Sequence, residues 1–174
     1  MLRVLGAALG IAALATLTLN GCTHRASAPA EAVSAADALR GAWRSQIRFE
    51  SGPFAPMKGL EFMFVFNEGG TLTESSNYDA APPVPPAYGV WRATGPGQFE
   101  ATYVFYVTAA PKRLEELMSG GWTPAGFGVF KERIQLAEDG QTFASTIDYT
   151  QFDNEGKPSE GASRGQGSGR RIAF

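Results

Sequence analysis

The residues of this sequence that could take part in chemistry are carboxylates, arginines and tyrosines. Its single cysteine, Cys22, and its single histidine, His24, lie two positions apart in a stretch without periodicity near the amino terminus. A side chain on such a tether cannot be held in catalytic geometry, which excludes a Ser-His-Asp triad and a zinc site built on cysteine or histidine. No Asp-x-Asp-x-Asp calcium loop is present. We therefore expect no metal and no cofactor.

Strand parity predicts which of the remaining side chains meet inside the folded protein. Side chains alternate between the two faces of a strand, so the large apolar residues mark the inward face. Six polar residues share that face: Glu74, Ser76, Tyr103, Glu132, Ser145 and Tyr149. In the last strand, an inward Ile172 brings Ser168, Gln166 and two arginines, Arg164 and Arg170, to the same side.

Buried charges must be paired or hydrogen-bonded, and Glu74 and Glu132 could pair with Arg164 and Arg170. The alternative is that some of these groups lie in water at an open rim and others only stabilise the core. On the first reading, aromatic residues and one acid–arginine pair line an internal pocket: Phe62, Phe64, Tyr103, Phe105, Tyr149, Glu132 and Arg164. Aromatic faces favour a planar or lipid-like ligand over a sugar or an ion.

A hydrophobic period of two predicts the elements that position these residues. It gives eight strands, at residues 43–50, 60–66, 71–76, 88–93, 99–107, 127–136, 142–152 and 163–172. Glycine-containing turns separate most of them, as at Asn67-Glu68-Gly69-Gly70. Residues 111–119 are the one substantial helix candidate, with Pro111 in its first turn and Gly120-Gly121 after it.

Eight sequential strands joined by tight turns predict an all-β fold, an antiparallel up-and-down barrel, because closure removes the exposed strand edges. The interior of such a barrel is filled by side chains or holds one small ligand. The glycine-rich run 165–169 lies within a strand and opens no helix, so we interpret it as thinning a crowded barrel wall rather than as a phosphate cradle.

Two short motifs resemble a known family. Gly41-Ala42-Trp43 in the first strand and Gly169-Arg170-Arg171-Ile172 in the last resemble calycins, the lipocalin and avidin-like barrels. The resemblance implies that Trp43 closes one barrel end, with Arg170 or Arg171 over its ring, and parity favours Arg170. Gly89-Val90-Trp91-Arg92 and Thr94-Gly95-Pro96 are further similar to a group of small, uncharacterised lipocalin-like bacterial proteins, relative to which residues 111–121 resemble an insertion.

The amino-terminal residues are typical of an exported bacterial lipoprotein. Arg3 precedes an uncharged apolar stretch, and Leu19-Asn20-Gly21-Cys22 resembles a lipobox, although Asn20 is unusual there. We therefore predict a signal peptide (1–21), a flexible tether (22–38) beginning at a lipid-bearing Cys22, and a barrel domain (39–174). A retained membrane anchor and an ordinary secretory signal are the alternatives. Thr23 in place of Asp favours the outer membrane, facing the periplasm, if the host has two membranes.

The sequence leaves three classes of function open. A formal net charge of −2 and the lack of clustered Lys and Arg exclude sequence-independent nucleic-acid binding. The first class, which we favour, is a membrane-anchored protein that binds or carries a small, largely apolar ligand. The second is an isomerase or cyclase that uses a glutamate, for example Glu132, as general acid or base together with tyrosines on an apolar substrate. The third is a structural envelope protein with a solid barrel.

Overall fold

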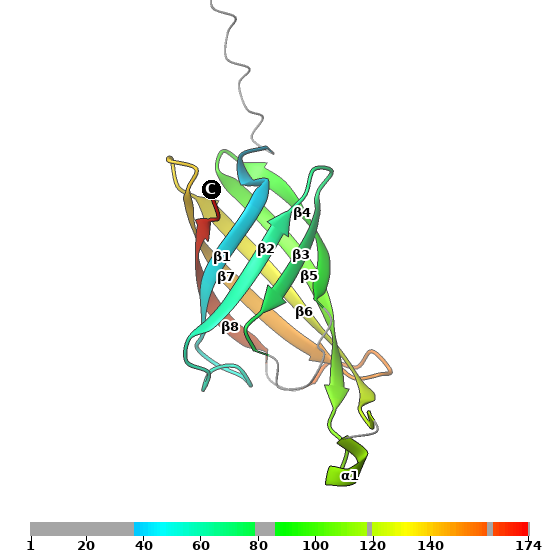
Figure 1. Ribbon diagram of the computed structural model, residues 1–174. Helices are drawn as coiled ribbons and strands as arrows, with labels where there is room; N and C mark the ends of the chain where they lie inside the picture. Colours follow the sequence, from blue (N-terminus) through cyan, green and yellow to red (C-terminus); the bar gives the residue numbers. More distant parts are fainter. Residues whose placement is uncertain (1–36, 79–85, 118–119, 160–161, 174) are drawn as a thin grey trace, which may run out of the picture. The chain divides into compact units, whose positions relative to one another are not determined.

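Eight antiparallel strands form a closed barrel in which each strand pairs with its neighbours in the chain and β8 pairs back with β1 (Figure 1). The computed structural model describes residues 37–78, 86–117, 120–159 and 162–173. The strands are β1 (Gly41–Phe49), β2 (Leu60–Phe66), β3 (Thr71–Ser76), β4 (Ala87–Gly95), β5 (Gln98–Ala109), β6 (Thr123–Leu136), β7 (Thr142–Phe152) and β8 (Ser163–Arg171). The predicted eight-stranded up-and-down barrel is confirmed.

The predicted helix at residues 111–119 is reduced to a single turn, α1 (Leu114–Leu117). It lies at the tip of the β5–β6 hairpin, which Figure 1 shows extending past the rest of the barrel. Pairing in this hairpin continues to Ala109 and Thr123, beyond the predicted ends of both strands. Residues 118–119 lie outside the described part of the chain. No helix among the described residues is long and apolar enough to cross a membrane.

Strand β8 faces the interior with the opposite parity to the one predicted. Its buried positions are Ser163 and three glycines, 165, 167 and 169, whereas Arg164 and Arg170 are exposed on the outer surface. Ile172, which set the predicted parity, follows the last residue of the strand and is 51% exposed. Glycine contributes no side chain to a hydrophobic pattern, so alternation carried no information in this strand.

The inward glycines of β8 are required by the packing of the side chains opposite them. A Cβ atom built on Gly169 would lie 2.2 Å from the ring of Phe143, and one on Gly167 would lie 2.3 Å from Ser145 Oγ. Both distances are shorter than van der Waals contact, so a side chain at either position would displace its neighbour. The interpretation of these glycines as thinning a crowded wall agrees with this packing.

One end of the barrel is closed by Trp43, which is fully buried. The short 3₁₀ helix η1 (Asp37–Leu39) precedes β1 at this end, and Trp43 Nε1 donates a hydrogen bond of 2.9 Å to the carbonyl of Leu39. The guanidinium of Arg171 lies 4.3 Å from the Trp43 ring centroid and donates to the backbone carbonyls of Ala38, Arg40 and Gly140. The assignment of this contact to Arg170 was therefore wrong, because β8 has the opposite parity.

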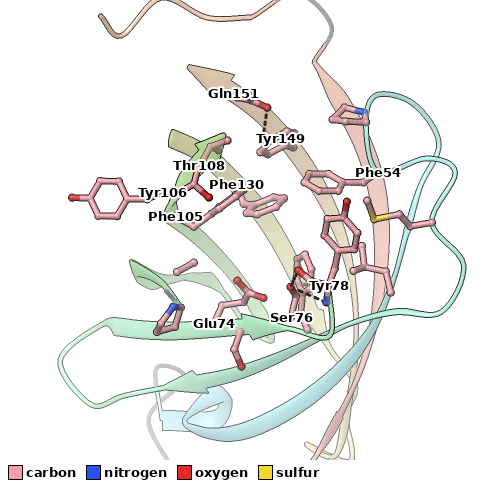
Figure 2. A pocket seen from close by; sticks show the side chains of 18 of the residues that line it. Phe54, Glu74, Ser76, Tyr78, Phe105, Tyr106, Thr108, Phe130, Tyr149 and Gln151 are labelled. Atoms are coloured by element: carbon pink, nitrogen blue, oxygen red, sulfur yellow. Dashed lines mark hydrogen bonds between the residues drawn. The ribbon is translucent and has the colours of Figure 1, made fainter. Parts of the chain in front are cut away.

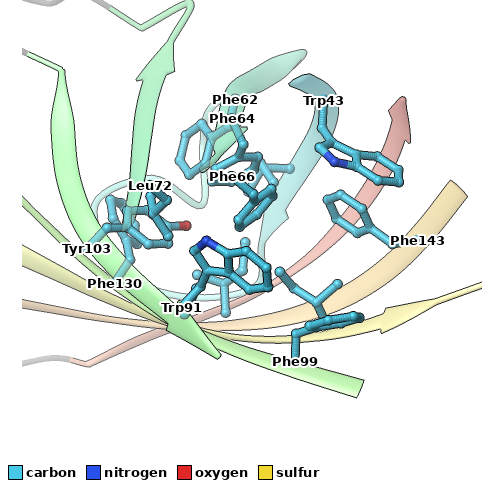
Figure 3. Packing of buried hydrophobic residues seen from close by; sticks show 14 of the residues in the cluster. Trp43, Phe62, Phe64, Phe66, Leu72, Trp91, Phe99, Tyr103, Phe130 and Phe143 are labelled. Carbon is cyan, nitrogen blue, oxygen red and sulfur yellow. The ribbon is translucent and has the colours of Figure 1, made fainter. Parts of the chain in front are cut away.

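Aromatic side chains fill the barrel next to this end (Figure 3). Trp43 packs on Phe143 with their ring centroids 5.1 Å apart, and Trp91 packs on Phe66 at 5.7 Å. The predicted signal peptide 1–21, the lipid-bearing Cys22 and tether residues 22–36 lie outside the described residues. The folded domain includes Asp37, two residues before its predicted start at residue 39.

Candidate functional site

A cavity of about 570 Å³ lies at the barrel end opposite Trp43. Its walls come from the first residues of β2, the last residues of β3 and β5, the middle of β6 and the carboxyl half of β7. The β1–β2 loop contributes Phe54 and Met57. Because one barrel end is packed with side chains and the other holds this cavity, the described interior is partly solid and partly hollow.

Four aromatic rings form one wall of the cavity (Figure 2). Phe130 of β6 packs on both Phe105 and Tyr149, with ring centroids 5.4 and 4.9 Å away, and those two rings lie 6.0 Å from each other. Phe54 of the β1–β2 loop approaches Tyr149 edge-on at 4.9 Å. Offset and edge-to-face pairs of this kind stabilise the rings in fixed positions. The wall is therefore a continuous apolar surface of mutually packed rings.

Gly128 allows the aromatic wall to form. It lies opposite Phe105 in the β5–β6 ladder, and a Cβ atom there would lie 2.3 Å from the Phe105 ring and 2.7 Å from the Tyr149 ring. No side chain larger than that of glycine fits without moving these rings. The position of Phe105 at the cavity thus depends on the missing side chain at residue 128.

Glu74 is the acidic group at the cavity. It lies on β3 between Phe64 of β2 and Ala87 of β4, and Figure 2 shows its carboxyl group directed toward Phe105 and Phe130. The residue is only 5% exposed, and its Oε1 has no hydrogen-bond partner among the described residues. Burial, together with the nearby charge of Glu132, raises the pKa of Glu74 from 4.5 to about 8. At neutral pH its carboxyl group is therefore mostly protonated.

Glu132 lies further into the barrel and does not line the cavity. Its Oε2 accepts a hydrogen bond of 2.9 Å from the hydroxyl of Tyr103, and both residues are buried. Burial raises the pKa of Glu132 to about 7, with the hydroxyls of Ser145 and Tyr103 acting in the opposite direction. Burial and the two carboxylates raise the pKa of Tyr103 well above its ordinary value. The two acids thus belong to one buried polar layer.

No basic side chain neutralises these acids within the described residues. Neither Glu74 nor Glu132 takes part in an ion pair there, and the described lining of the cavity contains no Lys or Arg. No described group of three His, Cys, Asp or Glu residues could hold a metal ion. The site is consequently apolar and acidic.

The structure brings together only part of the predicted pocket. Phe62, Phe105 and Tyr149 line the cavity, whereas Phe64, Tyr103 and Glu132 belong to the packed interior beside it. Arg164 is the clear error: it lies on the outer surface, where its Nε donates to Asp148 Oδ1 at 3.2 Å. The predicted pairing of Glu74 and Glu132 with Arg164 and Arg170 is therefore wrong, for the parity reason given above.

Three important lining residues were missing from the predicted pocket. Phe130 shares the inward parity of Glu132 and Ile134, so the alternation of β6 contained the signal. Glu74 was placed inward, but parity could not tell whether it or Glu132 reaches the cavity. Phe54 lies in a loop without periodicity, and no sequence pattern identifies it. No protein-family model matches the chain, and no curated protein matches it.

Proposed function

We propose that the barrel binds and carries a small, largely apolar ligand at its open end, as part of a lipoprotein anchored in the cell envelope. The observation that carries the proposal is a cavity with an aromatic wall and one buried carboxyl group, Glu74. Its volume of about 570 Å³ is within the range of about 300–1,000 Å³ typical of small-molecule sites. Apolar walls with few polar groups supply contact area, and the polar group sets the orientation of the ligand.

The geometry favours binding over the two other functions. Glu132, one candidate acid or base of an isomerase or cyclase, contacts Tyr103 in the packed interior and does not line the cavity. Glu74 does line it, but its Oε1 has no hydrogen-bond partner among the described residues that would orient it for proton transfer. A general acid or base must reach the proton it transfers. A purely structural barrel gains nothing from an apolar cavity, because unfilled space loses packing contacts.

The membrane anchor is supported by the sequence around Cys22, where several acyl chains would give stable attachment. The contact between Trp43 and Arg171 supports a calycin-like barrel, a class with internal pockets. We place the protein on the outer membrane, facing the periplasm, if its host has two membranes. There the domain could take up an apolar molecule at the membrane surface.

The uncharged fluorophore N-phenyl-1-naphthylamine is expected to bind the mature domain saturably, with one molecule per barrel. Ser76→Trp places an indole at the cavity, because Ser76 lines it and is only half-buried. This change should weaken binding at least about tenfold, the equivalent of about 1.4 kcal/mol. Fluorescence titration measures both affinities.

Ser168→Trp is the matched control, because Ser168 is exposed on the outer face of β8. It should leave the affinity unchanged, and thermal unfolding of both variants checks that each is folded. Absence of saturable binding to the unaltered domain, or equal affinities for all three proteins, would contradict the proposed cavity.

The anchoring proposal makes a separate prediction. Cells grown with an alkyne analogue of palmitate should label the unaltered protein, and Cys22→Ala should abolish the label because no other cysteine is available. The variant should remain unprocessed or appear in the soluble fraction. Gel fluorescence after click chemistry measures the label, and an unlabelled wild-type protein would end the lipoprotein proposal.

A further inference from the structure

We propose that the natural ligand carries a protonated amine, which forms an ion pair with Glu74 while its apolar part contacts the aromatic wall. The inference rests on the proposed function and names the ligand class for the same cavity. It follows from a feature that a purely apolar site would not need, the buried carboxyl group of Glu74, whose Oε1 has no partner among the described residues.

Glu74 is built into the site rather than carried on its rim. It lies in the middle of β3, with Phe64 and Ala87 as its neighbours on the two adjacent strands. Both neighbours are buried and neither can form a hydrogen bond through its side chain. A buried carboxyl group without a partner costs free energy. A ligand ammonium group would supply the missing partner and offset that cost.

The rest of the cavity suits a cation and opposes an anion. Aromatic faces attract ammonium groups through their negative quadrupoles, and Phe105, Phe130 and Tyr149 present rings at the cavity (Figure 2). No described lining residue is basic, so a carboxylate or phosphate ligand would find no cationic partner there. It would also be repelled by Glu74 whenever that carboxyl group is ionised. An amine with an apolar chain is the ligand class that would use both the aromatic wall and the carboxyl group of Glu74.

Binding of an ammonium group requires the ionised form of Glu74, so affinity depends on pH. The titratable groups facing Glu74 are Glu132 of β6 and Tyr103 of β5, and Tyr78, Tyr106 and Tyr149 also line the cavity. The carboxyl group of Glu74 has its pKa raised to about 8 by burial and by Glu132. A simple amine stays protonated below about pH 10. The raised pKa values of Glu74 and Glu132, about 8 and about 7, place the titration of both acids between pH 6 and pH 9.

The size of the pH effect follows from the ionised fraction of Glu74. With a pKa of about 8, this fraction rises about 50-fold from pH 6 to pH 8 and only about twofold from pH 8 to pH 9. Affinity for an amine should follow the same curve. Binding at pH 7 should release close to one proton, which calorimetry in buffers of different ionisation enthalpy detects.

Three probes of equal chain length test the inference: decylamine, 1-decanol and decanoate. Each is used to displace N-phenyl-1-naphthylamine from the mature domain at pH 6, 7, 8 and 9. We expect decylamine to bind at least about tenfold more tightly than 1-decanol at pH 8, since an ion pair in a desolvated site exceeds a neutral hydrogen bond. Decanoate should bind most weakly, and 1-decanol should show little dependence on pH.

Glu74→Gln should remove the advantage of decylamine and its pH dependence while leaving 1-decanol unchanged. Glu132→Gln, the matched control, should keep the advantage and shift its rise to lower pH, because a like charge beside Glu74 is gone. Equal affinity of decylamine and 1-decanol at pH 8, or an advantage that survives in Glu74→Gln, would overturn the inference and leave the proposed function standing. If neither the fluorophore nor any of the three probes binds, as direct calorimetry checks, the proposed function fails and the inference fails with it.

Discussion

The free energy of unfolding is expected to fall by several kcal/mol as the pH rises from about 5 to about 8. The cause is the buried pair of acids, Glu74 and Glu132, whose pKa values are raised to about 8 and about 7. The folded barrel holds a proton on each acid, whereas the unfolded chain releases both protons near pH 4.5. Most proteins lose stability in acid, so a barrel that is most stable in mild acid would be unusual.

The sign follows from proton linkage. Below pH 4.5 both acids are protonated in the folded and the unfolded state, and their contribution is fully present. As pH rises toward about 7 and then about 8, the folded state binds more protons than the unfolded state, so stability decreases by up to about 1.4 kcal/mol per pH unit for each acid. Tyr103 and Tyr149, whose pKa values are also raised, titrate above this window.

Urea denaturation at pH 5, 6, 7 and 8 measures the effect. Glu74→Gln combined with Glu132→Gln should flatten the dependence, since the amide of Gln cannot ionise and can still bond to Tyr103. Glu138→Gln, in the exposed turn between β6 and β7, should leave the slope unchanged. A stability that is constant or rises between pH 5 and pH 8 would show that the two acids are not protonated in the barrel.

The second large effect is expected at the closed end. Trp43→Ala should lower the free energy of unfolding by about 3–5 kcal/mol, the usual cost of removing a fully buried tryptophan side chain. The change deletes the bond to the Leu39 carbonyl, the packing on Phe143 and the face on which the Arg171 guanidinium lies. Chemical denaturation monitored by circular dichroism measures it.

The two adjacent arginines provide the control for this end. Arg171→Met keeps an apolar stem and loses three hydrogen bonds to backbone carbonyls, so it should also destabilise the barrel. Arg170→Met, on the outer face, should change stability by no more than about 0.5 kcal/mol. If both substitutions had the same effect, the assignment of Arg171 to the Trp43 ring would be wrong.

The fold was predictable from the sequence wherever both faces of a strand carry side chains. In β2, for example, phenylalanines alternate with exposed or half-buried residues, and this pattern predicted both ends of the strand correctly. In β8 the interior positions are Ser163 and three glycines, so the pattern has no hydrophobic period. Ile172 then determined the assignment, although it follows the strand and lies in solvent. Because of that one residue, Arg164 and Arg170 were predicted to face the interior, whereas both face outward.

The cavity lining was less predictable, because it depends on how far along the barrel axis each inward residue lies. Parity places Glu74 and Glu132 on the same inner face but does not say which of them lies at the hollow end. That distinction follows from strand register and tilt, which arise only when the sheet closes. The loop residue Phe54 completes the aromatic wall through contacts with Tyr149 and Phe130 that no periodic pattern specifies.

Closure through β8 also determines when the protein can fold. The hydrogen bonds of Arg171 to the carbonyls of Arg40 and Ala38 span 131 and 133 residues of chain, and the ladder between β1 and β8 spans similar separations. Contacts this distant in sequence slow folding, because loop-closure entropy is lost before they form. A chain that lacks its last strand is an open sheet with two free edges, at β1 and β7. The barrel can therefore close only after β8 has been synthesised.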